Sequence, residues 1–276
     1  MSADPHPIGV CEVSRVRLAI AYDGTDFSGW AQQPGRRTVQ QTLQEALATI
    51  LRGPEIRLTV AGRTDAGVHA SGQVAHFEVP GRIEVDGVLP RLAGLLPPDV
   101  RVSAVERVSP DFDARFSALW RRYVYRISDA DGGVDPLRRR FVLGWRRVDA
   151  ERMHAAAQLL LGLNNFAAFC RARPDASTIR TMQSFAVGRE PSGEIEVRLQ
   201  ADAFCHSMVR SLVGALLRVG EGARPVEWPA QLLARTRRAD DVPVVPAHGL
   251  VLSEVGYPQE AELAARALVT RNRRDR

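Results

Sequence analysis

Lysine is absent from this sequence of 276 residues, so all 37 basic side chains are arginines. Against 32 acidic residues they leave a formal net charge of +5 at pH 7. A guanidinium group stays charged at every physiological pH, binds phosphate oxygens in pairs and stacks on bases. The arginine content is therefore consistent with a nucleic-acid-binding surface, although many soluble enzymes with other functions are also basic.

Long apolar runs are missing as well. No stretch approaches the roughly eighteen apolar residues that a membrane-spanning helix requires, so we expect no membrane segment. The first residues, Met1–Ser14, lack a basic start followed by an apolar stretch, which argues against a secretory signal. Both absences favour a cytoplasmic protein.

Cysteine is scarce. The three cysteines are Cys11, Cys170 and Cys205, and no two of them form a C-x-x-C spacing. An odd number without metal-ligand spacing predicts neither a disulfide framework nor a zinc site, and it suits a reducing cytoplasm. We therefore expect no bound metal and no disulfide framework.

The first half of the chain, residues 14–109, alternates between strand and helix patterns. Strands place apolar residues at every second position, and helices show an apolar stripe at helical spacing. The expected elements are a strand at Ser14–Tyr22, a helix at Thr38–Arg52, strands at Ile56–Val60 and Gln73–Val79, a short helix at Asp86–Leu96 and a strand at Val100–Val108. This order is that of the ferredoxin-like, or split βαβ, unit, which many RNA-binding modules use.

The second half, residues 110–257, repeats this order with one additional helix. The expected elements are a strand at Ser117–Ser128, a helix at Asp149–Leu161, a hairpin of Thr178–Arg189 and Glu194–Phe204, helices at His206–Val219 and Trp228–Arg237, and a strand at His248–Val255. No linker rich in Gly, Ser or Pro separates the halves. We therefore predict one α+β domain of two ferredoxin-like halves with a central cleft. Residues 1–13 and the basic residues 258–276 are expected to be tails.

A segment of small residues between the strands Ile56–Val60 and Gln73–Val79 carries Asp65. Its glycines, Gly62 and Gly67 among them, allow close backbone approach to a large ligand. A carboxylate on such a loop can act as a nucleophile or as a general base. The Thr-Asp-Ala-Gly residues are equally ordinary in a hairpin turn, and residue types alone favour the turn.

The segment Gly62–Ala70, G-R-T-D-A-G-V-H-A, resembles the active-site motif of the tRNA pseudouridine synthase A family over nine consecutive residues. The resemblance implies that Asp65 is the catalytic residue. Further segments from about Ser14 to Tyr257 resemble motifs of the same family. They are Tyr22–Trp30, Arg115–Ala118, Arg121–Tyr125, Phe204–Gly214 and Ala247–Leu250.

The chain departs from the family pattern in two places. Ala31 follows Trp30, where the family often has Gln, and Leu163–Phe166 lacks the His-Asp pair that often precedes Phe. Neither departure touches the Asp65 motif.

By this resemblance the protein is expected to isomerise uridine to pseudouridine at positions 38, 39 and 40 of the tRNA anticodon stem-loop. The reaction cuts the glycosidic bond and rejoins the same base through carbon, so the product is an isomer and no cofactor is implied. The resemblance also implies a homodimer, with two halves that share a largely antiparallel sheet. The expected partner is tRNA, without a membrane or a small-molecule cofactor.

Two further site residues follow from the family motifs. Arg210 lies at the margin of its helix's apolar stripe, where it would ordinarily be solvated, and the resemblance favours an ion pair that keeps Asp65 ionised. Tyr123 shares a strand face with Tyr125. The resemblance indicates that Tyr123 stacks on the target base, whereas Tyr125 is expected to be a core residue.

Arg63 and Leu250 complete the predicted site. Arg63 stands two residues before Asp65, and the resemblance implies that it holds the flipped-out nucleotide; a structural ion pair is the alternative. Leu250 is expected to close the apolar side of the uracil pocket, or else to belong to the core. The histidines His69 and His76 are interpreted as structural, and Cys205-His206 as the entry to a helix.

Two rivals remain from other classes of protein. A non-catalytic RNA-binding module would bind tRNA with a steep salt dependence and leave uridine unchanged. A nucleosidase would hydrolyse the same glycosidic bond and release free uracil. The Asp65 motif argues against the first, and no water-positioning base is identified for the second.

Overall fold

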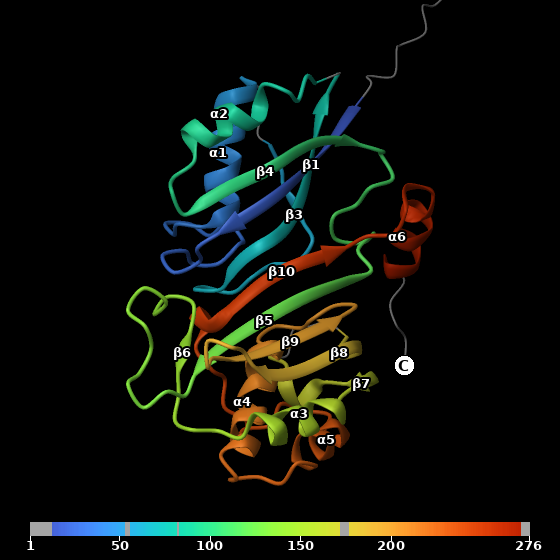
Figure 1. Cartoon of the computed structure of the whole chain (residues 1–276). Helices are drawn as coiled ribbons and strands as arrows, with labels where there is room; N and C mark the ends of the chain where they lie inside the picture. The colour runs from blue at the N-terminus through green and yellow to red at the C-terminus, as the bar shows by residue number, and fades with distance from the viewer. Residues whose placement is uncertain (1–12, 53–55, 82, 172–176, 272–276) are drawn as a thin grey trace, which may run out of the picture.

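The structure is a computed structural model that describes residues 13–52, 56–81, 83–171 and 177–271. Its centre is one ten-stranded sheet that runs through the whole molecule, with helices packed on it at both ends (Figure 1). The strands are β1 (Val13–Tyr22), β2 (Thr59–Val60), β3 (His69–Pro80), β4 (Val100–Val108), β5 (Trp120–Ser128), β6 (Leu143–Gly144), β7 (Gly162–Asn165), β8 (Ile179–Arg189), β9 (Ile195–Ala201) and β10 (Leu250–Gly256).

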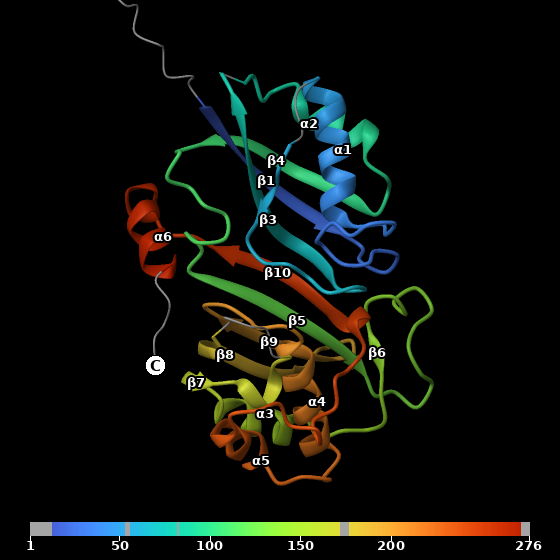
Figure 2. The same ribbon diagram turned by 180° about the vertical axis from the view of Figure 1, so that it is seen from behind.

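Helices cover the sheet in two groups. The helices are α1 (Val39–Leu51), α2 (Val88–Leu95), α3 (Ala150–Gln158), α4 (Met208–Gly220), α5 (Trp228–Gln231) and α6 (Leu263–Arg271), with short 3-10 turns η1 (Ala167–Phe169), η2 (Leu232–Ala234), η3 (Ala247–Gly249) and η4 (Glu260–Glu262). Seen from behind, α1 and α2 lie over β1 and β4, while α3, α4 and α5 gather on the strands of the second half (Figure 2).

The sheet order is β4-β1-β3-β10-β5-β9-β8-β7, with β2 beside β3 and β6 beside β5. Every pairing is antiparallel except β10 with β3 and β6 with β5. The prediction of an α+β fold with a largely antiparallel sheet is therefore confirmed.

Local sequence explains why the main elements form. In β1, Val16, Leu18 and Ile20 alternate with partly exposed residues and are buried. Helix α1 begins where Thr38 caps it, because the Thr38 hydroxyl accepts a hydrogen bond from the N–H of Gln41. Both features match the sequence prediction.

Strand β3 starts earlier than predicted. His69 and Ala70 already pair with Val251 and Leu252 of β10, so the end of the Gly62–Ala70 motif lies in the sheet. This short parallel pairing joins the two halves. Gly72 lies against it so closely that an added Cβ would stand 2.1 Å from the carbonyl oxygen of Ser253.

Several boundaries differ from the predictions. The predicted strand Ile56–Val60 is confirmed only at its end, β2. Helix α3 ends at Gln158, so Leu161 is exposed and does not face the core. The short strands β6 and β7 were not predicted. Val13 of the expected tail 1–13 begins β1, and residues 260–271 of the expected tail 258–276 form η4 and α6. The rest of the first tail and residues 272–276 lie outside the described residues.

The prediction for the cysteines is wrong for two of them, and the cysteines therefore give no support to a reducing cytoplasm. Cys170, just after η1, and Cys205, just before α4, form a disulfide with a Cα–Cα distance of 5.7 Å. They are 35 residues apart, and only the folding of β8 and β9 between them brings them together. The third cysteine, Cys11, lies outside the described residues.

Candidate active site

The Asp65 loop is held against the segment that follows β1. The N–H of Trp30 donates to the carbonyl of Thr64 at 3.1 Å, and the N–H of Gly67 donates to the carbonyl of Phe27 at 3.3 Å. Gly67 has a φ of +76°, a backbone conformation that favours glycine. The loop is thereby fixed on both sides of Asp65.

A buried network of polar side chains supports the Asp65 loop. The hydroxyl groups of Thr64 and Tyr22 lie 2.8 Å apart. The side-chain amide of Gln73 donates to the Tyr22 hydroxyl at 3.3 Å and to the carbonyl of Gly62 at 2.8 Å. Burial raises the pKa of Tyr22 to about 12, so this hydroxyl keeps its proton at neutral pH.

Arg121 of β5 connects this loop to the second half. Its buried guanidinium donates to the carbonyl oxygens of Ala61, Asp202 and Arg115 at 2.6, 2.8 and 2.7 Å. Three carbonyl acceptors in a buried site provide hydrogen-bond partners for the N–H donors of the guanidinium group. Arg121 therefore sets the distance between the Asp65 loop and the strand that carries Tyr123.

The histidines of β3 are structural, as predicted. Nδ1 of His69 accepts a hydrogen bond from the N–H of Gly24 at 3.0 Å, and Nε2 lies 3.1 Å from the carbonyl of His248. Burial lowers the pKa of His69, so the ring is neutral and its 3.1 Å approach to Asp23 is not an ion pair. Nδ1 of His76 accepts from the N–H of Ala114.

The Asp65 carboxylate has a basic side chain at each oxygen. Oδ1 lies 3.3 Å from Nε2 of His206, and Oδ2 lies 3.9 Å from Nη1 of Arg210. The Asp65 side chain is 28% exposed, so it is reachable from solvent while being partly desolvated. Arg210 also donates from Nε to the carbonyl of Val245 at 2.6 Å, which anchors its guanidinium.

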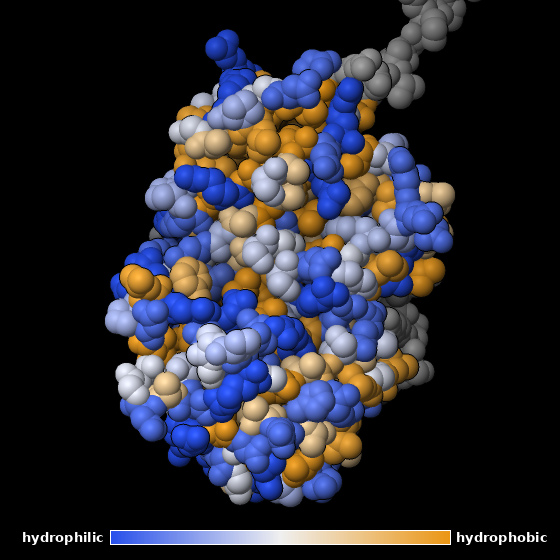
Figure 3. All heavy atoms as spheres, viewed as in Figure 1, coloured by the Kyte–Doolittle hydropathy of each residue, from blue (hydrophilic) through white to orange (hydrophobic). Residues whose placement is uncertain are grey.

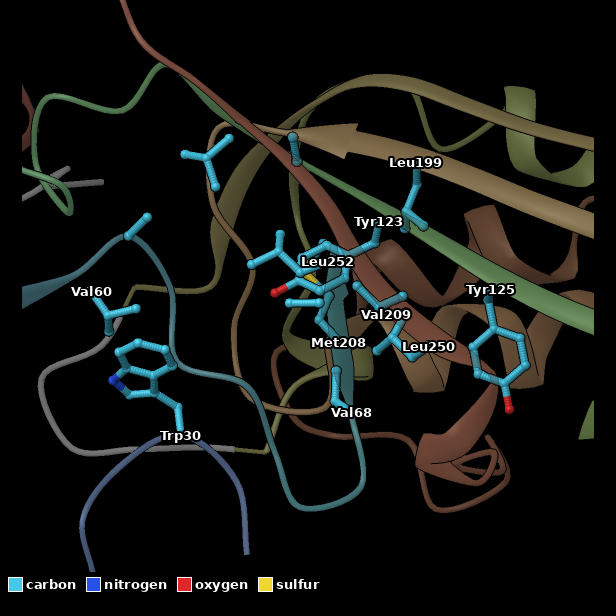
Figure 4. Close-up of a cluster of buried hydrophobic side chains, with 14 of the residues drawn as sticks. Trp30, Val60, Val68, Tyr123, Tyr125, Leu199, Met208, Val209, Leu250 and Leu252 are labelled. Carbon is cyan, nitrogen blue, oxygen red and sulfur yellow. The ribbon is translucent and has the colours of Figure 1, made fainter. Parts of the chain in front are cut away.

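Tyr123 lies in the wall beside this carboxylate. Its ring stands edge-on to Phe204, with 5.0 Å between ring centres. Burial raises the pKa of Tyr123 above its usual range, and the negative charge of Asp65 also raises it. Figure 4 shows the Tyr123 hydroxyl directed towards the side where Trp30 and Val60 lie, whereas the Tyr125 ring extends away from it.

Tyr125 is a core residue, as predicted. It is fully buried, and its hydroxyl donates to the carbonyl of Pro246 at 2.7 Å.

All five predicted site residues line one cavity of about 710 Å³: Arg63, Asp65, Tyr123, Arg210 and Leu250. The Leu250 side chain is buried and belongs to the apolar part of the lining (Figure 4). The Arg63 side chain is exposed and has no ion pair among the residues that the structure describes. The alternative of a structural ion pair for Arg63 therefore finds no support.

The cavity is rich in cations. Besides Arg63 and Arg210, the lining contains Arg115, Arg121, Arg180, Arg266 and Arg271. Hydrophilic side chains also gather across the middle of the face in Figure 3, with hydrophobic ones between them. Arginines in a groove, next to buried aromatic residues, are the ordinary means of holding single-stranded nucleic acid.

Three parts of the site were not predicted. His206 was interpreted only as part of a helix entry, Phe204 as part of a strand and family motif, and α6 as a tail. Arg266, Val269 and Arg271 of α6 line the cavity, and Arg271 forms an ion pair with Asp113 at 2.9 Å. The sequence gives no local sign of these contacts, because each joins segments that are far apart along the chain.

Within the described ranges, no three His, Cys, Asp or Glu side chains come together as a set of metal ligands. The helices in those ranges are also too short or too polar to cross a membrane.

Comparison with known proteins gives a consistent result. A family model described as tRNA pseudouridine synthase matches residues 18–117 and 156–258. A tRNA pseudouridine synthase A of Frankia casuarinae is 55% identical over 93% of this chain and 94% of its own length. One of Streptomyces griseus is 53% identical over 94% of this chain and 93% of its own length.

Among solved structures, a Cbf5-Nop10-Gar1 complex aligns with 73% of this chain and 54% of its own chain, at 11% identity and a TM-score of 0.30. A similarity of that size carries no information about the site.

Proposed function

This chain belongs to the tRNA pseudouridine synthase A family, and from that premise we propose that Asp65 is the nucleophile with which this isomerase converts uridine to pseudouridine in tRNA. The observation that carries the proposal is the position of Asp65. Its carboxylate is partly exposed in an arginine-lined cavity, beside Tyr123 and between His206 and Arg210. No other Asp or Glu carboxylate with this combination of neighbours occurs among the cavity residues.

The isomerisation has three steps. The bond between N1 of uracil and C1′ of ribose breaks, the uracil turns, and a bond forms between C5 and C1′. The Asp65 carboxylate attacks or stabilises the electron-poor sugar carbon, as the carboxylates of glycosidases do. The C5 proton leaves at the end and N1 regains one, so atoms balance without an added reactant.

The neighbouring residues supply binding and charge. Tyr123 stacks on the target base, and Leu250 closes the apolar side of the uracil pocket. Arg210 places a positive charge 3.9 Å from Oδ2 of Asp65 and pairs with the carboxylate. Arg63 holds the nucleotide in its flipped-out position. The Arg63 guanidinium can reach a phosphate or the space that the target base leaves in the base stack.

The substrate region is the anticodon stem-loop, with positions 38, 39 and 40 as targets, and the working enzyme is a cytoplasmic homodimer. The support for these points is the close match of the Gly62–Ala70 motif and of the whole chain to the family. The cavity fits the substrate in size and charge, since a flipped nucleotide needs a pocket with cations at its edge.

We also infer that the two halves are ferredoxin-like units. With the short strands β6 and β7 left out, the strand orders β4-β1-β3-β2 and β10-β5-β9-β8 both follow the arrangement fourth-first-third-second within their half. Such a repeat explains why the cavity lies between the Asp65 loop of one half and β5 and α4 of the other.

Mapping pseudouridine in tRNA tests the target positions. The tRNA of a strain that lacks this protein is incubated with the purified enzyme, and pseudouridine is located by chemical labelling and sequencing. We expect new pseudouridine at positions 38, 39 and 40 only. Modification elsewhere in the tRNA, with those positions unchanged, would overturn the assigned target, and release of free uracil would indicate a nucleosidase.

A further inference from the structure

His206 is the basic side chain nearest to the Asp65 carboxylate. Its Nε2 lies 3.3 Å from Oδ1, whereas the Arg210 guanidinium reaches Oδ2 only at 3.9 Å. The hydrogen bond from Arg210 Nε to the carbonyl of Val245 holds the guanidinium back from the carboxylate. Arg210 therefore supplies charge, and the closer contact belongs to His206.

The backbone around His206 is fixed on both sides. Its carbonyl accepts a hydrogen bond from the N–H of Arg171 at 3.0 Å. The preceding residue, Cys205, is joined to Cys170, and the following residue, Ser207, has a φ of +62°. A left-handed conformation at a residue other than glycine costs free energy and persists only where the surroundings enforce it. This strained turn directs the His206 ring to the carboxylate at the start of α4.

We propose that His206 is a positioning residue for Asp65, and this inference rests on the proposed function of Asp65 as nucleophile. Nε2 of His206 faces Oδ1 at 3.3 Å, while Nη1 of Arg210 faces Oδ2 at 3.9 Å. Basic side chains at both oxygens restrict rotation of the carboxylate and leave its remaining lone pairs directed to the cavity. The neutral ring is sufficient, because the tautomer with its proton on Nε2 already provides the donor.

The orientation of the carboxylate matters because the attack on C1′ requires a narrow range of distances and angles. A displacement of about 1 Å of a reacting group can reduce the rate by roughly 100-fold. Without His206, the Asp65 side chain keeps its place in the loop but gains rotational freedom about its last bond. Substrate binding depends on other residues of the cavity and is unaffected.

Two substitutions distinguish the effect of the N–H donor of His206 from the effect of the volume of its ring. His206→Phe keeps a ring of similar shape but has no donor, and His206→Gln has no ring but offers a side-chain N–H near the position of Nε2. Both variants are compared with the unmodified protein by release of tritium from tRNA labelled at uridine C5, with kcat and KM measured separately. Thermal melting reports whether each variant is folded.

We expect His206→Phe to lower kcat by about 10- to 100-fold with KM unchanged, and His206→Gln to recover most of that loss. Undiminished kcat in His206→Phe overturns the proposal. So does an equal loss in both variants when both are folded, because the ring and not the donor is then what matters. A loss that appears in KM also overturns it, since His206 would then contact the substrate.

Asp65→Asn is measured in parallel to separate the two proposals. If Asp65→Asn abolishes release while His206→Phe does not reduce it, only the role of His206 fails. If Asp65→Asn retains full release, the proposed function of Asp65 fails, and the role of His206 fails with it.

Discussion

At the scale of single residues, the site combines one partly exposed carboxylate with side chains that differ in how firmly they are held. Asp65, Tyr123 and Arg210 have defined neighbours, whereas Arg63 extends from the loop without an ion pair among the described residues. Because Arg63 forms no ion pair within the described part of the chain, its guanidinium is available for the substrate. Arg63 can therefore be removed at little cost to the fold.

Arg63→Gln is expected to lower kcat/KM for tRNA by roughly 10- to 100-fold, the loss of one charge-assisted contact worth about 1.5–3 kcal/mol. The free energy of unfolding should change by less than about 0.5 kcal/mol, because the side chain is exposed. Tritium release and urea unfolding measure the two quantities. Arg91→Gln, an exposed arginine of α2 away from the cavity, is the matched control, and an equal loss of activity there would remove any special role for Arg63.

His76 gives a prediction of pH dependence. Burial lowers the pKa of His76 below its unfolded value of 6.5, and the charge of Arg15 lowers it further. The unfolded chain then binds more protons than the folded one as the pH falls below 6.5, so the free energy of unfolding decreases. In His76→Asn, the side-chain oxygen can still accept from Ala114 but does not titrate. Urea unfolding at pH 7.5 and 5.5 should show a smaller decrease for this variant, and an equal decrease would contradict the assignment.

At the scale of elements, local signals predicted the long strands and the starts of α1 and α3, but they missed α6 and placed the end of α5 at Arg237 instead of Gln231. Thr38 and Asp149 cap α1 and α3 as expected, because a cap is set by residues within three positions of each other. The start of β3 at His69 could not be predicted in this way, because it depends on pairing with β10 near the other end of the chain. The contacts of His206 and of α6 with the cavity depend on equally distant partners.

The disulfide between η1 and α4 is the clearest case of such a distant contact, and it fixes the residues that precede α4. Cys170→Ser together with Cys205→Ser should lower the free energy of unfolding by about 2–4 kcal/mol, since the bond closes a long loop of the unfolded chain. Urea unfolding of the double variant measures this. Unmodified protein treated with a phosphine reductant should match the variant, and equal stability with and without reductant would show that the bond contributes nothing.

At the scale of the whole molecule, strands of the two halves meet at one short parallel pairing between β3 and β10, and Arg121 also links the second half to the Asp65 loop. The Asp65 loop belongs to the first half, whereas Tyr123, His206, Arg210 and Leu250 belong to the second. The cavity therefore exists only while the halves keep their relative position. Family motifs in the sequence indicated which residues form the site, and the pairing of the halves explains how they come together.

Gly72→Ala tests this junction. The added Cβ would stand 2.1 Å from the carbonyl oxygen of Ser253, so β3 and β10 must separate. We expect a loss of about 1–3 kcal/mol in stability and a larger loss of activity than stability alone explains. Gly94→Ala in α2 is the control, because its Cβ meets no atom within 4 Å and should stabilise the helix by about 0.5–1 kcal/mol. Full activity in Gly72→Ala would show that the site tolerates movement of the halves.

The nucleophilic role of Asp65 is tested most directly by a single-turnover assay of Asp65→Asn with tRNA that carries tritium at uridine C5. The account predicts that this variant binds tRNA with the affinity of the unmodified protein and unfolds at the same urea concentration, yet releases no tritium to water. Release at the rate of the unmodified protein would contradict the account, because an amide cannot replace the attacking carboxylate.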